Sequence, residues 1–271
     1  MLALISKKIV ILFFTIFLMP VIARGQTQFD KAIKYSVDDF NKVLSEEHSG
    51  WSSVYSDMKP ITFIGNLTGS KQQDLVVVLD SNNYHVGLGM LYVFRFEKEH
   101  IKLILVKKEF RIAANIVSWN KHSGLLVAVG KWNDGQTDST ADVLVYDNGK
   151  FESVIQFPYS SSIIQRGYSR KSQVISSDSN QIQVIKYEND LKYEDGKPTC
   201  TEVSLQTYSW DEQTFKFKSG GNKPLTKNDL DGILLNNKLK FPDDLEGICD
   251  FKHSKSSKDQ KKYKVPVTAD N

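Results

Sequence analysis

Residues 146–151 read Tyr146-Asp147-Asn148-Gly149-Lys150-Phe151, in which an aromatic residue and an apolar residue flank four turn residues. The Asn148-Gly149 pair predicts a β-hairpin, because both residues tolerate the positive φ angles that tight hairpin turns require. The same arrangement recurs at residues 96–101 and at residues 210–215. The chain therefore repeats a strand–turn–strand unit at three places.

A second spacing extends each hairpin into a four-stranded unit. The apolar run from Leu75 begins 21 residues before Phe96, and the run from Leu125 begins 21 residues before Tyr146. The third copy carries extra residues in a polar loop. We expect strands over residues 61–65, 74–80, 89–96 and 101–106, then 112–119, 124–131, 141–147 and 151–157, and then 171–177, 181–188, 201–210 and 214–218. A four-stranded meander that recurs at about 50 residues is typical of a β-propeller blade.

Helical patterns flank the strand-rich region. Apolar residues recur at spacings of three and four over residues 29–47, and Thr226 begins a second helix that runs to about Asn236. We therefore expect an all-β fold of repeated four-stranded meanders, propeller-like, with an N-terminal and a short C-terminal helix. Three copies are fewer than the four or more blades of closed propellers. Either residues 27–59 and 219–250 complete a ring, or the sheets form an open or sandwich-like stack.

The first 25 residues have the pattern of a secretory signal peptide. Lys7 and Lys8 precede an apolar run from Ile9 to Ala23, and Ala23-Arg24-Gly25 is a small-x-small cleavage pattern. The alternative is an uncleaved membrane anchor, but about fifteen apolar residues are fewer than the roughly 20 that span a bilayer. The sequence thus predicts an exported protein, periplasmic or secreted, without a transmembrane segment after cleavage.

The charge of the chain bears on the kind of partner that we expect. The chain holds 35 Lys and Arg against 32 Asp and Glu, and its first 25 residues carry three of the basic residues and no acidic one. A mature chain is near neutral, whereas non-specific nucleic-acid binding needs a clustered positive excess, so no nucleic-acid partner is expected. The expected division is a signal peptide (1–25), a helix and connector (26–59), a propeller-like domain (60–250) and a disordered basic tail (251–271).

Cys200 and Cys249 are the two cysteines of the chain. In an exported protein they can form a disulfide bond, which would close a loop of about 50 residues and stabilise the fold by roughly 4 kcal/mol. The alternative is a pair of unrelated buried thiols. There is no C-x-x-C motif to support a zinc site, and we expect neither a metal nor a cofactor.

A polar loop precedes the first apolar run. It reads Gly65-Asn66-Leu67-Thr68-Gly69-Ser70-Lys71-Gln72-Gln73-Asp74-Leu75-Val76-Val77-Val78, and a strand of sequence Leu91-Tyr92-Val93-Phe94 follows. These residues resemble the FG-GAP or VCBS-type repeat. The chain is also similar in layout to small exported, propeller-like bacterial proteins, some of which inhibit a cell-wall hydrolase.

The resemblance implies a propeller and, in the family, calcium bound at the first, third, fifth and ninth loop positions. Here those positions are Asn66, Thr68, Ser70 and Asp74. Calcium prefers several carboxylate or carbonyl oxygens, so a loop with a single carboxylate predicts no tight calcium site. We expect Asn66, Gly69 and Asp74 to hold a turn between two strands.

The longest polar connection in each copy joins its second and third strands, over residues 80–89, 131–141 and 188–200. Because strands of a meander alternate in direction, we expect these loops to emerge at one end of the stacked copies and to form a binding face. The expected binding residues are Tyr84, His85, Trp132, Asp134, Asp138, Asp190, Tyr193 and Glu194. Rings beside carboxylates suit recognition of a sugar or a basic protein patch, although Trp132 has the alternative of packing inward.

No familiar catalytic motif occurs in the chain, and no catalytic residue is assigned. G-x-S-x-G, H-E-x-x-H, G-x-x-x-x-G-K and G-x-G-x-x-G are all missing. The favoured hypothesis is an exported non-enzymatic binding module for a protein or a cell-envelope glycan, with hydrolase inhibition as one form of it. The alternative is an exported glycan-directed hydrolase, since glycosidases need two carboxylates roughly 5–10 Å apart and the loops are rich in Asp and Glu.

Overall fold

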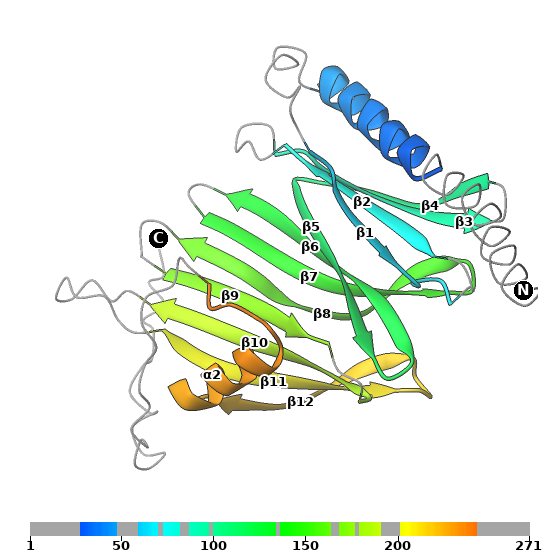
Figure 1. Cartoon of the computed structure of the whole chain (residues 1–271). Coiled ribbons are helices and arrows are strands. Elements are labelled where there is room, and N and C mark those ends of the chain that lie inside the picture. The colour runs from blue at the N-terminus through cyan, green and yellow to red at the C-terminus, as the bar shows by residue number, and fades with distance from the viewer. Residues whose placement is uncertain are drawn as a thin grey trace, which may run out of the picture.

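The structure is a computed structural model. It describes residues 28–47, 59–69, 73–81, 87–97, 100–133, 136–163, 168–176, 179–190 and 201–242. The strands of these residues form two antiparallel sheets, one of four strands and one of eight (Figure 1). The four-stranded sheet has the order β1-β2-β3-β4, and the eight-stranded sheet runs from β12 through β11, β10, β9, β8, β7 and β6 to β5.

The chain forms its strands close to the predicted places. The first meander consists of β1 (Ile61–Gly65), β2 (Asp74–Asp80), β3 (Gly89–Glu97) and β4 (His100–Glu109). The second meander consists of β5 (Arg111–Trp119), β6 (His122–Asn133), β7 (Gln136–Asp147) and β8 (Lys150–Ile163). The third meander consists of β9 (Tyr168–Ile175), β10 (Gln181–Asp190), β11 (Glu202–Asp211) and β12 (Lys216–Pro224). The all-β class and the three four-stranded meanders are therefore confirmed.

Three meanders stack face to face, and alternation along the strands shows why. In β2, Leu75, Val77 and Leu79 pack under the N-terminal helix, residues 28–47. Val76 and Val78 point the opposite way and share a core with β5, β6 and β7. Both faces of β2 are covered, which is why its sequence is apolar without interruption.

The second and third meanders belong to one sheet. β8 extends to Ile163, and its last residues pair with the start of β9, from Ser160 opposite Lys171 to Ile163 opposite Tyr168. The two halves of this sheet nevertheless cover each other, since Trp119 and Val143 of one half share a core with Trp210 of the other. A stack of separate blades would not contain this pairing.

A helix closes each end of the stack (Figure 1). The helix α2 (Lys227–Asn236) covers the outer face of the third meander with Leu230 and Leu234. It begins with a capping box, in which the Thr226 hydroxyl accepts from the backbone N–H of Asp229 at 3.2 Å and Asp229 accepts from that of Thr226 at 3.2 Å. Both predicted helices are thus confirmed.

No fourth meander completes a ring among the described residues. Those between 27 and 59 are mainly helical, and those between 219 and 242 form the end of β12 and α2. Of the two alternatives, the described residues fit an open or sandwich-like stack, and a propeller is not confirmed. Neither sheet closes into a barrel, because β1, β4, β5 and β12 are end strands in the described part of the chain.

Candidate binding site at the loop end of the meanders

A cavity of about 280 Å³ lies where the second and third strands of the first two meanders meet their connections. Asp80 ends β2, Arg111 begins β5, Lys131 is near the end of β6, and Asp138 is near the start of β7. The remaining lining residues are Phe110, Ile112, Ala113, Ala128, Gly130, Thr137, Ser139, Tyr159 and Ser160. Asp80, at the start of the predicted 80–89 connection, and residues of the predicted 131–141 connection border one cavity. The prediction of a long loop over residues 131–141 is wrong, because β6 continues to Asn133 and β7 begins at Gln136, with Lys131 paired to Asp138.

Two glycines let the first meander come close to this cavity. A Cβ on Gly87, which has φ +56°, would lie 2.0 Å from the ring of Phe110, and one on Gly89 would lie 2.7 Å from the backbone nitrogen of Ile112. Any side chain at these positions would push β3 away from the corner between β4 and β5. Hydrogen bonds also join the two ends of the connection between β2 and β3. Ser81 N donates to Leu88 O at 2.8 Å, and Leu88 N donates to Ser81 Oγ at 3.1 Å.

A β-bulge places Tyr159 on the cavity wall. Ser139 of β7 pairs with Ser160 of β8, but the next residue, Thr140, pairs with Pro158, so Tyr159 has no partner in the ladder. Bulges of this kind redirect a side chain, and Pro158 is a residue that strands tolerate at bulges because it lacks an N–H. Burial raises the pKa of the Tyr159 phenol, which stays protonated and can donate a hydrogen bond.

Hydroxyl residues line the cavity together with Tyr159, namely Thr137, Ser139 and Ser160. Ser139 Oγ and Ser160 Oγ form a hydrogen bond across the two strands, and Ser160 N donates to Ser139 Oγ at 3.0 Å. One pair further along, the hydroxyl of Ser161 donates to Oδ1 of Asp138. The wall formed by β7 and β8 thus offers several hydroxyls and a carboxylate in a fixed array.

The charges that line the cavity balance. Asp80 and Asp138 supply two carboxylates, while Arg111 and Lys131 supply two cations. Lys131 and Asp138 are directly opposite in the β6–β7 ladder, and Arg111 is opposite Gly130 in the β5–β6 ladder. A Cβ on Gly130 would lie 3.1 Å from the Cβ of Arg111, so this glycine leaves room for the arginine stem. A balanced, hydroxyl-rich wall favours a neutral polar ligand over a strongly charged one.

Asp138 is the predicted binding residue that the structure places on this cavity. Trp132 lies in β6 opposite Thr137, and Asp190 ends β10 opposite Tyr168, but their side chains are outside the described part. The other expected sites also lie outside the described residues, namely Tyr84, His85, Asp134, Tyr193, Glu194, Cys200 and Cys249. The same holds for the signal-like segment (1–25) and the basic tail (251–271).

Several lining residues were missed at the level of sequence. Arg111 is at a strand start and Tyr159 is within a strand, whereas the expected binding residues belong to predicted loops. Pro158, directly after the expected strand over residues 151–157, was the available signal for a bulge beside it. Arg111 had no such signal, because its position depends on how the first meander turns into the second.

The polar loop before β2 acts as a turn. Asp74 is fully buried, and its Oδ2 accepts from the backbone N–H groups of Leu67 at 2.8 Å and Thr68 at 2.9 Å. The Thr68 hydroxyl donates to Oδ1 at 3.2 Å, and Gly69 adopts φ +65°. Burial raises the pKa of Asp74 despite these hydrogen bonds. The turn-holding role expected for Asp74 and Gly69 is confirmed, and the carboxylate is occupied by the donors of its own loop.

In the described ranges, no group of three or more His, Cys, Asp or Glu side chains is arranged to hold a metal ion. No helix within those ranges combines the length and apolar character that crossing a bilayer requires. Neither the known protein-family models nor the curated proteins contain a match to this chain.

Proposed function

We propose that the protein is an exported binding module that recognises a neutral, hydroxyl-rich ligand, in the first place a cell-envelope glycan, at the loop end of its meanders. The observation that carries the proposal is the cavity bordered by Asp80, Arg111, Asp138 and Tyr159, with its balanced charges and hydroxyls. Its volume of about 280 Å³ is close to the lower limit of small-molecule sites, roughly 300 Å³. It therefore fits one unit of a longer chain, such as a single sugar ring.

Three features support the other parts of this proposal. The signal-like first 25 residues support export to the periplasm or the cell exterior. The FG-GAP-type sequence of residues 65–78 and the stacking of meanders support a propeller-like origin. A ligand chain longer than one unit would extend from the cavity onto the neighbouring connections, where Tyr84 and Trp132 remain expected contacts.

The test is binding of purified cell-envelope glycan and its soluble fragments, measured by sedimentation and by isothermal titration calorimetry. Asp138→Asn should weaken binding by about 10- to 100-fold, because a hydrogen bond to a charged group contributes roughly 1.5–3 kcal/mol. Lys150→Ala is the matched control, since Lys150 lies at the opposite end of β7 and β8. Equal losses in both variants, or capture of envelope proteins without any glycan, would contradict the glycan proposal.

A second candidate is a glycan-directed hydrolase, favoured by the two carboxylates, Asp80 and Asp138, on one cavity. It predicts release of new reducing ends from the bound glycan and loss of that release in Asp138→Asn. The binding proposal predicts no release from either protein. A reducing-sugar assay on the sedimented glycan separates the two functions.

A further inference from the structure

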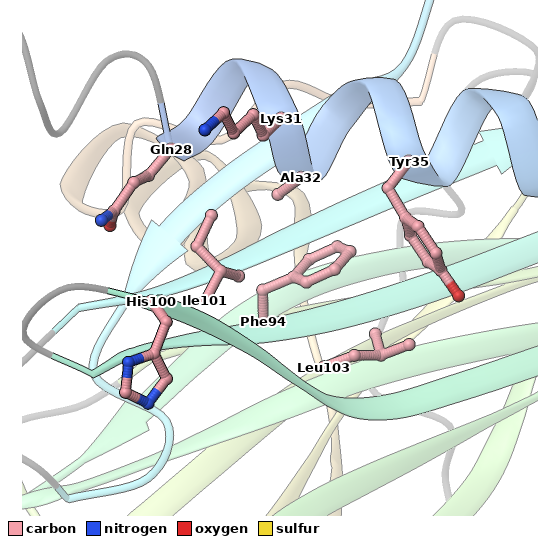
Figure 2. Close-up of a pocket in the computed structure, with 8 residues that line it drawn as sticks. All are labelled: Gln28, Lys31, Ala32, Tyr35, Phe94, His100, Ile101 and Leu103. Atoms are coloured by element: carbon pink, nitrogen blue, oxygen red, sulfur yellow. The ribbon is translucent and has the colours of Figure 1, made fainter.

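A second cavity, of about 520 Å³, lies between the N-terminal helix and the strands β3 and β4 (Figure 2). It exists because the helix packs its buried residues, Ala32, Phe40 and Leu44, mainly over β2 and β3. The helix-facing row of β4 is left partly open as a result. Ile101 and Leu103 of that row are only half-buried and line the cavity.

One end of this cavity is apolar and has fixed walls. Phe94 is buried and forms the floor between Ile101 and Leu103, while Tyr35 overhangs it from the helix (Figure 2). Tyr35 is 49% exposed, yet its ring is held edge-on against Tyr92 at 6.4 Å and against Phe94 at 6.1 Å. Such ring pairs are favourable. The Tyr35 ring is therefore held in place as one wall of the cavity, while part of its surface stays exposed.

The other end is polar. Gln28 and Lys31 extend from the helix and His100 from the start of β4 (Figure 2). Gln28, Lys31 and Tyr35 are three and four residues apart, which places them along one side of the helix. His100 is 3.4 Å from the carboxylate of Glu97, whereas Lys31 forms no hydrogen bond or ion pair with the described residues. Lys31 is therefore a cation without an ion-pair partner among the described residues, and it lies beside an open apolar cavity.

We propose that this cavity binds a small amphipathic carboxylate, with its apolar body on Phe94, Leu103 and Tyr35 and its carboxylate at Lys31. Ligand sites in proteins are mostly apolar cavities of roughly 300–1,000 Å³ with a few polar groups that fix orientation, and this cavity has that size and division. The cation at one end requires an anionic head group, and the apolar walls require an aliphatic or aromatic body. This inference is independent of the glycan proposal, since the two cavities share no lining residue.

Three probes of equal chain length test the proposal on the purified protein: decanoate, decan-1-ol and decyltrimethylammonium, each below its micelle concentration. Isothermal titration calorimetry should give the tightest binding for decanoate and the weakest for the cation. Lys31→Gln should weaken decanoate binding up to about fivefold, the upper range for an exposed ion pair, and leave decan-1-ol unchanged. Lys34→Gln, an exposed cation of the same helix outside the cavity, should change neither.

A cavity-filling change locates the site. Leu103→Trp should abolish binding of decanoate, while Asp138→Asn, in the other cavity, should leave it intact. Circular dichroism and the melting temperature check that each variant is folded. No decanoate binding at millimolar concentration, equal effects of Lys31→Gln and Lys34→Gln, or full binding by a folded Leu103→Trp variant would overturn the proposal. Concentration-dependent dimerisation that Tyr35→Ala removes would instead assign the cavity to a second copy of the chain.

Discussion

The carboxylate of Asp211 fixes the turn that joins β11 to β12. Its Oδ1 accepts from the backbone N–H of Gln213 at 2.9 Å and of Thr214 at 3.4 Å, and Lys218 forms an ion pair with Oδ2. Only 16% of the Asp211 side chain is exposed, against 71% for Lys218. The hydrogen bond from Lys218, followed by that from Gln213, lowers the pKa of Asp211 from 3.8 to about 2.

This shift gives a pH dependence with a definite sign. Between pH 3.8 and about 2 the unfolded chain binds more protons at this residue than the folded protein, so stability falls as the pH falls through that range. Asp211→Asn should flatten the dependence of the unfolding free energy on pH there, measured by urea denaturation. Asp231→Asn, on exposed α2 surface, should leave the slope as it is. An unchanged slope in Asp211→Asn would show that the turn does not hold the carboxylate in solution.

Residues that use their own loop were easier to predict than residues that depend on another element. Asp74 and Gly69 hold a local turn, and Asp138 lies at the end of the second meander where the sequence pattern predicted a binding residue. Arg111 reaches the same cavity only because Gly87 and Gly89 allow the first meander to approach. That approach is a property of packing between meanders, and no local pattern encodes it.

The repeated hairpins differ at the level of the element. In the β7–β8 hairpin Asp147 pairs with Lys150, and Asn148 and Gly149 adopt φ +47° and +91°, as predicted for a two-residue turn. In the β11–β12 hairpin Trp210 pairs with Phe217 and not with Phe215, so the predicted strand over residues 214–218 starts two residues too early. Phe215 lies in the turn with φ +54°.

Aromatic packing explains why the β11–β12 hairpin pairs differently from the β7–β8 hairpin. Phe215 lies 4.9 Å from the ring of Trp210 and edge-on to His122 at 6.4 Å. These contacts hold a phenylalanine in a backbone region that disfavours side chains. The sequence spacing was the same as in the other two copies, so the difference could not be read from the chain alone.

At the β7–β8 turn, the effect of backbone strain on stability can be measured separately from steric contact. Gly149→Ala should destabilise the protein by about 1 kcal/mol, because alanine disfavours the left-handed region and a Cβ there meets no atom within 4 Å. Gly221→Ala in β12 is the matched control: its Cβ also meets nothing within 4 Å, and its φ is not positive. It should be neutral or slightly stabilising. Thermal unfolding measures both, and equal losses would show that the turn is not the cause.

The whole molecule is a stack whose layers were predictable and whose connectivity was not. Apolar alternation indicated strands with two buried faces, as in β2. The joining of β8 to β9 uses main-chain hydrogen bonds between Ser160–Ile163 and Tyr168–Lys171. Such bonds are available to any sequence, so no residue pattern distinguishes a continuous eight-stranded sheet from separate blades. The pairing links the second and third meanders into one structural unit.

That unit should unfold cooperatively, and Trp119 tests it. Trp119 is fully buried, 5.3 Å from the ring of Trp210 in the other half of the sheet and 4.9 Å from that of Phe217. Trp119→Ala should lower stability by about 3–5 kcal/mol and reduce hydrogen-exchange protection equally in β6 and β10, because the two meanders share one core. Tyr35→Ala, at a half-exposed ring outside this core, should lower stability much less and leave hydrogen-exchange protection in β6 and β10 unchanged. Loss of protection confined to β6 would mean that the meanders unfold separately, despite their common sheet.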